Sequence, residues 1–148
     1  MQSLIPLLRE ILSHHREWFD SKGNAGVYAN LSEENLEGGN FSGAVLVEAN
    51  FQGANLNKAD FSGADLRGAN FYDAQLSKAQ FLTSNLEEAD LMWADLKGAR
   101  LAEARLAGAY LQGADLRETD VTQDQIDQAY TNEDTFLPSP IKKMIAKP

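Results

Sequence analysis

An apolar residue recurs at every fifth position from Leu31 to Val121, and this period constrains the fold more than any other feature of the chain. All of these centres are Leu or Phe except the last, which is Val121. An α-helix turns about 100° per residue, so residues five apart form no continuous apolar stripe. A β-strand alternates its faces, so an odd period would send every second centre into solvent. Neither ordinary element explains the pattern.

The residues around each centre are equally regular. The position two before the centre is nearly always Ala, the position before it is usually Asn or Asp, and Gly is frequent two after it. The pattern is consistent if the chain bends once per repeat, so that every centre points into the same interior. Ala fits inside such a corner, and Gly tolerates the positive φ that a tight bend requires. A short fixed period of this kind is typical of a solenoid.

The motif A-[DN]-[LF]-x-x over residues 29–121 resembles the pentapeptide-repeat family, of the bacterial type with helical flanks. The resemblance implies an all-β solenoid, a right-handed quadrilateral β-helix with four repeats per coil. One feature agrees with an even number, because between Phe41 and Phe81 every second centre is Phe with Leu between. With four repeats, nearly five coils at the strand spacing of ~4.8 Å give a rod about 23 Å long.

The flanks divide the chain into residues 1–28 as an N-terminal capping helix and linker, residues 29–121 as the β-helix, and residues 122–148 as a C-terminal cap helix and tail. An apolar face predicts a helix over residues 1–22, with Ser3 as N-cap and Pro6 in the first turn. Its members are Leu4, Leu8, Ile11, Leu12, His15, Trp18 and Phe19.

The C-terminal flank begins with a capping-box pattern, since Gln125 follows Thr122 by three residues. A short helix is expected there, and Pro138 and Pro140 should stop it. The ends of a solenoid expose unpaired backbone groups, so we expect both flanks to cap it.

Composition excludes several classes of site and partner. The chain has no Cys, which excludes disulfides, thiolate metal sites and thiol nucleophiles. Its 22 acidic and 13 basic residues give a net charge of −9, which argues against nucleic acid or an anionic membrane as partner. There is no apolar run of the ~20 residues that a membrane helix needs and no visible secretory signal. We expect a soluble cytoplasmic protein.

No residue pattern indicates catalysis. His14 and His15 are the only histidines, and as neighbours on a helix they diverge by about 100°, so they cannot bind one metal. Carboxylates such as those of Asp60 and Asp65 recur with the repeat, as solvated surface residues do. No glycine loop precedes a helix as phosphate binding requires. We expect no enzyme, no cofactor and no metal.

The outward positions of the repeat should be polar, so the apolar exceptions are informative. They are Val45, Val47, Tyr72, Leu82, Met92, Trp93 and Tyr110. Stacking by four repeats places Tyr72 and Met92 in one row, with Trp93 and Tyr110 close by on the same face. An exposed aromatic patch usually marks a contact surface, so these four residues are the candidate interaction patch. We expect a monomeric protein–protein interaction scaffold.

Two alternatives remain open at this stage. The chain's own tail, with Phe136, Leu137, Ile141, Met144 and Ile145, could cover the patch in place of a partner. Some members of the resembled family act as DNA mimics that bind gyrase, so the acidic surface could bind a type II topoisomerase. Residues 29–121 carry 15 acidic and 7 basic side chains. A duplex about 23 Å long would carry roughly 13 negative charges, and the intermixed basic residues favour the scaffold.

Overall fold

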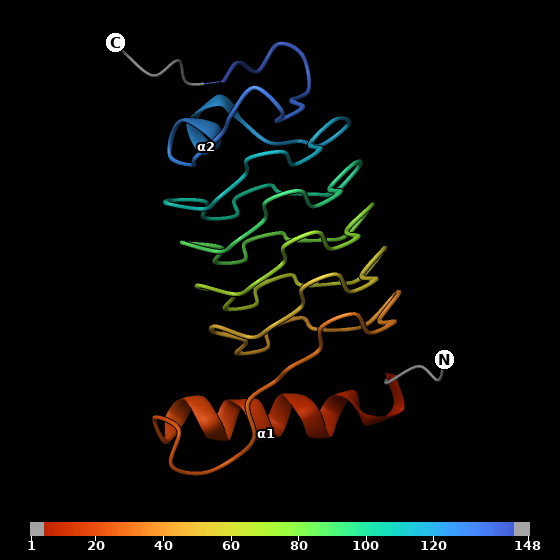
Figure 1. Ribbon diagram of the computed structural model, residues 1–148, viewed down its shortest axis with the longest axis vertical. Coiled ribbons are helices and arrows are strands. Elements are labelled where there is room, and N and C mark those ends of the chain that lie inside the picture. The colour runs from red at the N-terminus through yellow and green to blue at the C-terminus, as the bar shows by residue number, and fades with distance from the viewer. Residues whose placement is uncertain (1–4, 144–148) are drawn as a thin grey trace.

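The computed structural model describes residues 5–143, which form a solenoid with a helix lying across its N-terminal end (Figure 1). A 3₁₀ turn, η1 (Ile5–Leu7), leads into α1 (Leu8–Asp20), and a short helix, α2 (Gln123–Asp127), lies at the opposite end. Between them the chain is paired by isolated parallel bridges rather than by long strands. None of the helices among the described residues is long and apolar enough to cross a membrane.

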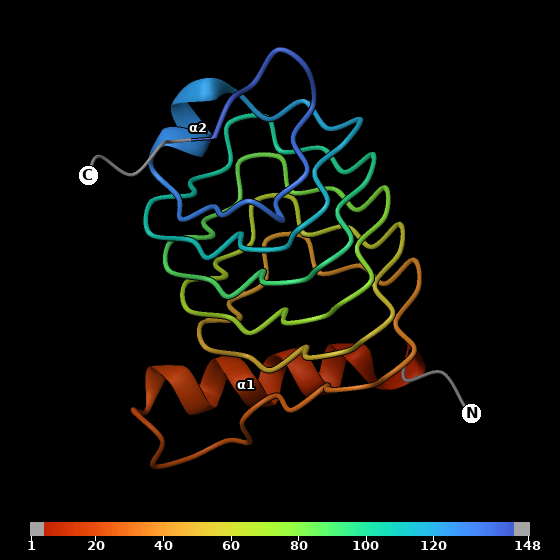
Figure 2. The same ribbon diagram turned by 45° about the horizontal axis from the view of Figure 1, so that its top comes forward.

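The bridges fix the register of the coils. They join residues twenty positions apart, from Asn30 with Asn50 to Asp95 with Asp115, so four five-residue repeats make one coil. This confirms the coil of four repeats that the family resemblance implied. Figure 2 shows the coils stacked on one another in this register.

Each coil therefore has four sides, which we number by their buried centres. Side 1 contains Leu31, side 2 Leu36, side 3 Phe41 and side 4 Leu46, and each side repeats every twenty residues.

The corners between sides are β-turns of one kind. The N–H of Ala44 donates to the carbonyl of Phe41 at 3.1 Å, and Gly43 between them has φ 67°. A positive φ at the third residue defines a type II turn. Every position two after a centre, from Glu33 to Glu118, has a positive φ. Gly adopts this positive φ without backbone strain, whereas the non-glycine residues at the equivalent positions of other repeats adopt it at an energetic cost.

The Asn or Asp that precedes most centres stabilises the same turn. Oδ1 of Asp60 accepts from the backbone N–H of Ser62 at 2.9 Å, and Oδ1 of Asn70 accepts from that of Tyr72 at 2.9 Å. Bonds of this kind, from a side-chain oxygen to a backbone N–H two residues on, favour turns. This second recurring feature of the motif thus acts locally, within the corner that follows it.

The centres form one buried column per side. All of them are 5% exposed or less, which confirms the predicted register of the core. The ring of Phe61 stacks on those of Phe41 and Phe81, with centroids 4.6 and 5.1 Å away. It also meets Phe51 and Phe71 edge to face, a geometry that adds to the burial of area. The alternation of Phe and Leu therefore builds two interlocked phenylalanine columns.

Helix α1 is shorter than the predicted helix over residues 1–22. It spans Leu8–Asp20, and Pro6 lies in the 3₁₀ turn before it. The predicted cap Ser3 lies outside the described residues. The N-cap that the structure shows is Leu7, with no side-chain cap bond, so the predicted helix start is wrong. Leu8 and His15 are buried against the first coil.

The loop after α1 packs directly on the helix backbone. Gly23 donates its N–H to the carbonyl of Trp18 at 2.8 Å, just after α1 ends at Asp20. At Gly26, a Cβ would lie 2.4 Å from both the carbonyl oxygen of His14 and the nitrogen of Trp18. Only glycine allows this approach, since φ there is 78°.

At the C-terminal end the pairing continues beyond the motif. Thr122 and Gln125 form the predicted capping box at the start of α2. The chain then rejoins the solenoid, because Tyr130 bridges to Tyr110 and Phe136 bridges to Asp115. The motif ends near residue 121, but a partial sixth coil follows it.

Side chains complete the edge of the last full coil where the backbone does not. Nε2 of Gln125 donates to the carbonyls of Leu101 and Ala104 at 2.7 and 2.9 Å. Oδ1 of Asn132 accepts from the N–H of Gly113 at 3.0 Å. These bonds satisfy backbone groups that the end of a solenoid would leave unpaired.

Candidate interaction surface

The four patch residues predicted from the sequence lie on side 1, in consecutive coils. The N–H of Asp73 donates to the carbonyl of Met92 at 3.0 Å, which places the 70–73 and 90–93 segments side by side. Tyr110 bridges to Asp90 one coil further on. Tyr72, Trp93 and Tyr110 are 37%, 47% and 41% exposed, and Met92 is half-buried. These four residues therefore lie on one face of the solenoid.

The position of the Trp93 ring depends on Gly113, which lies one coil later in the same column. It sits at a turn position with φ 61°, and its N–H donates to the carbonyl of Gln112 at 3.0 Å. A Cβ at Gly113 would lie 2.4 Å from Cε3 of the indole ring. Gly113 therefore leaves the space that the ring occupies, and the ring lies along the solenoid surface.

Tyr130 extends the patch and was missed by the sequence reasoning. Its ring stacks on that of Tyr110 with centroids 5.2 Å apart, and it is 54% exposed. The signal was its distance of twenty residues from Tyr110, which equals one coil. It went unnoticed because residue 130 lies beyond the last recognisable repeat. We call Tyr72, Met92, Trp93, Tyr110 and Tyr130 the aromatic patch.

The tail, as far as Lys143, makes its contacts at the C-terminal end. Leu137 and Ile141 pack partly against the core, and the backbone of Lys142 exchanges hydrogen bonds with Gln123 of α2. Phe136 lies on side 2, where the guanidinium of Arg117 sits 5.0 Å from its ring centroid. Of the tail residues considered as a cover for the patch, Met144 and Ile145 lie outside the described residues.

The other apolar exceptions do not join the patch. Val45 and Val47 are on side 4 and half-buried, and Leu82 lies on side 3 with 37% exposure. Leu82 therefore serves as a matched control for Tyr72, which has the same exposed fraction on a different side.

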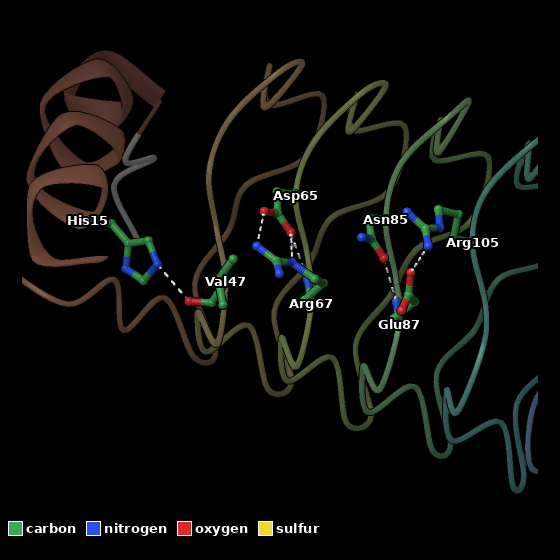
Figure 3. Close-up of polar contacts among 7 residues, drawn as sticks. All are labelled: His15, Val47, Asp65, Arg67, Asn85, Glu87 and Arg105. Carbon is green, nitrogen blue, oxygen red and sulfur yellow. Dashed lines mark hydrogen bonds and ion pairs between the residues drawn. The ribbon is translucent and has the colours of Figure 1, made fainter. Parts of the chain in front are cut away.

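His15 joins α1 to the first coil by two hydrogen bonds. Its Nδ1 accepts from the backbone N–H of Ala29 at 2.9 Å, so Nε2 carries the proton and donates to the carbonyl of Val47 at 2.9 Å (Figure 3). The ring also packs against those of Trp18 and Tyr28. Burial lowers the pKa of His15, although its bond to Val47 and the nearby Glu48 carboxylate act in the opposite direction. Of the two histidines, one is thus a buried structural residue and His14 is exposed.

Acidification is expected to weaken the fold through His15. The unfolded chain takes up a proton near the ordinary value of 6.5, and the folded chain only at a lower pH. The free energy of unfolding should therefore be highest above that value and fall as pH drops through the lowered pKa. Urea unfolding between about pH 7 and pH 5 measures this slope.

The control for this prediction is His15→Gln, which does not titrate. It should be less stable by about 1–3 kcal/mol at neutral pH, because one buried backbone group loses its partner. The free energy of unfolding of the His15→Gln protein should not fall between about pH 7 and pH 5 as that of the parent does. Asp65 and Asp115, whose pKa values are lowered by Arg67 and Arg117, respond only below their ordinary 3.8. If the free energy of unfolding changes equally with pH in both proteins, titrating groups other than His15 cause the pH dependence.

Ion pairs intermix the surface charges on sides 2 and 4. Arg67 pairs with Asp65 at 2.7 Å and Arg105 pairs with Glu87 at 2.7 Å, along the line of polar contacts that Figure 3 shows. Arg117 pairs with Asp115 in the same way on side 2. The hydrogen bond from Arg67 holds the pKa of Asp65 below its usual range. These sides therefore present charges of both signs.

The described residues contain no group of three His, Asp or Glu side chains able to hold a metal ion. The carboxylates of Asp60 and Asp65 lie on different sides of the solenoid, each in its own column of bridges. The exposed residues of the aromatic patch, unlike the turn and core residues, are not needed to form the repeat.

Comparison with solved structures supports this architecture. A pentapeptide repeat protein, Rfr23, from the cyanobacterium Cyanothece 51142 is 27% identical, with a TM-score of 0.66 over 74% of this chain and 88% of that chain. One from the thylakoid lumen of Arabidopsis thaliana is 31% identical, with a TM-score of 0.54 over 66% of this chain and 74% of that chain.

A third pentapeptide repeat protein, from Nostoc PCC 7120, is similar in fold at 22% identity. Its TM-score is 0.61, over 88% of this chain and 87% of that chain. No curated protein matches the chain. The family model for pentapeptide repeats matches residues 27–63, 44–81 and 84–123 with eight copies, which is more than half of the chain. The chain therefore belongs to the pentapeptide-repeat family, whose members form right-handed β-helices.

Proposed function

We propose that this protein is a noncatalytic scaffold that binds another protein through the aromatic patch. The observation that carries the proposal is the exposure of three large aromatic rings, Tyr72, Trp93 and Tyr110, in consecutive coils of one side. Tyr and Trp are the residues most enriched at the energetic centres of protein interfaces. A rigid solenoid presents them with little loss of conformational freedom on binding.

The same proposal includes the oligomeric state and the cellular location of the protein. We propose a cytoplasmic monomer without nucleic-acid or membrane partners, divided at residues 28 and 121 as the sequence indicates. Helix α1 and the segment after residue 121 act as caps in this proposal, supported by the bonds of His15 and Gln125 to opposite ends of the solenoid. A capped end cannot pair with the edge of another molecule.

Mimicry of DNA is the alternative function. Its support is the net charge of −9, and the ion pairs of Arg67, Arg105 and Arg117 weaken it by interrupting the negative surface. Gyrase supercoiling with added protein distinguishes the two. Inhibition at low micromolar protein would favour mimicry, and unchanged supercoiling would favour the scaffold.

The scaffold proposal predicts that the patch determines what the protein captures from a native lysate. The variant Trp93→Ala should lose its captured partner, since truncating a central aromatic contact costs about 2 kcal/mol or more in binding. Quantitative mass spectrometry of the captured proteins measures the change. The matched control is Leu82→Ala on side 3, which should capture the same proteins as the parent. Equal capture by parent and Trp93→Ala protein would exclude the patch as the binding surface.

A further inference from the structure

The aromatic patch lies on the one side of the solenoid whose own segments contain no basic residue, and the tail places one basic group at its C-terminal end, where Nζ of Lys143 donates to the carbonyl of Glu133 at 2.6 Å. Side 1 comprises residues 30–33, 50–53, 70–73, 90–93 and 110–113, and the partial sixth coil continues it at 130–133. These described segments contain no Lys or Arg. The basic residues of the coils lie on the other three sides, as Lys58, Arg67, Lys78, Lys97, Arg100, Arg105 and Arg117.

Acidic residues occupy backbone positions next to two of the exposed aromatic residues. Asp73 occupies the same column as Trp93, one coil earlier, and Asp90 bridges to Tyr110. Adjacent coils are separated by about 4.8 Å, so the backbones of Trp93 and Tyr110 each adjoin one that carries a carboxylate. Within the described residues, neither Asp73 nor Asp90 forms an ion pair. Side 1 thus combines aromatic faces with unneutralised negative charge.

We propose that side 1 binds an extended segment of a partner protein that carries arginine or lysine. This rests on the proposed function and specifies the chemistry of its partner. A guanidinium or ammonium group is attracted to the face of a Trp or Tyr ring, by about 0.5–2 kcal/mol per contact. The carboxylate of Asp73 attracts a cation placed at Trp93, and the carboxylate of Asp90 attracts one placed at Tyr110. Side 2 already shows one such contact, since Arg117 lies over the ring of Phe136.

The dimensions suit a short extended segment. From Tyr72 to Tyr130 the patch crosses three coil steps, about 14 Å at the spacing of adjacent strands. An extended chain rises about 3.3 Å per residue, so four or five residues cover this length. Alternate side chains of such a segment are about 6.6 Å apart, so two or three of them would face the patch.

A labelled peptide of alternating arginine and serine tests the inference by fluorescence anisotropy. The same peptide with citrulline in place of arginine keeps the shape of the side chain without its charge. We expect the arginine peptide to bind at least about tenfold more tightly than the citrulline peptide. The difference should shrink as salt is raised, because the Debye length falls from about 10 Å at 0.1 M to about 3 Å at 1 M.

Variants of the full-length protein locate the binding. Trp93→Ala, and separately Asp73→Asn combined with Asp90→Asn, should each weaken arginine-peptide binding about tenfold. The amide at position 90 retains the oxygen that accepts from the backbone of Met92. The matched controls are Leu82→Ala and Asp60→Asn on side 3, where Asp60 makes the same local turn bond. Both controls should bind as the parent does.

Two results would overturn the inference. One is no preference for the arginine peptide over the citrulline peptide. The other is equal weakening by the side 1 and side 3 variants, which would indicate attraction to the net charge alone. The proposed function is judged separately, by capture from a lysate. If Trp93→Ala abolishes capture while the Asp73/Asp90 double variant captures normally, the scaffold stands and the basic segment is excluded. If Trp93→Ala leaves capture intact, both proposals fail.

Discussion

A Leu66→Asp protein is expected to be unfolded at room temperature. Leu66 is fully buried in the fourth column of centres, between coils on both sides. Removing the leucine loses roughly 1.5–3 kcal/mol of burial. Burying an unpaired carboxylate in its place costs several kcal/mol more. The sum approaches the entire free energy of unfolding of an ordinary domain, which is about 5–15 kcal/mol. Circular dichroism and the loss of a cooperative urea transition measure the outcome.

The matched control places the same charge one residue after a neighbouring centre. Ser62 follows the buried Phe61 and is partly exposed, so Ser62→Asp should change the free energy of unfolding by no more than about 0.5 kcal/mol. If Leu66→Asp melts like the parent, its side chain cannot lie in the interior. The assignment of centres to the core would then be wrong for side 4.

The sequence predicted the interior of the solenoid well because one rule repeats in every coil. Each centre must point inward, and no tertiary contact elsewhere changes that requirement. Burial of Phe41, Phe61 and Phe81 in one column follows from the period and the coil of four repeats. The number four came from the family resemblance, with the alternation of Phe and Leu in agreement. Periodicity alone does not contain it.

The ends were predicted less well because they depend on contacts between distant residues. The hydrogen bonds of His15 with Ala29 and Val47 form only once α1 lies across the first coil. The sequence around His15 does not predict them. At the other end, α2 interrupts the five-residue period before Tyr130 rejoins side 1. A pattern search that stops at residue 121 therefore finds most of the patch but not its last ring.

Removal of residues 1–22 is expected to make the protein associate through its N-terminal end. The deletion removes α1 and leaves the N–H of Ala29 and the carbonyl of Val47 without their partner His15. It also uncovers the apolar surface on which Leu8 is buried. Unpaired edges next to apolar surface are sites of intermolecular pairing in β-proteins. Sedimentation velocity over a range of concentrations should show dimers or larger species, where the parent is expected to sediment as a monomer.

Two point variants separate the loss of the cap from other effects of truncation. Arg16→Ala changes the exposed face of α1, where Arg16 pairs with Asp20, and should leave the protein monomeric. Leu8→Asp keeps the full chain but charges the buried face of α1, so it should release the helix and reproduce the association. A truncated protein that stays monomeric and unfolds at the parent's urea concentration would mean that α1 does not protect the first coil. The coil's edge would then have to be blocked by its own turns, whose positive-φ corners carry Glu33 and Glu48. Charged side chains at a sheet edge are the other common means of preventing such pairing.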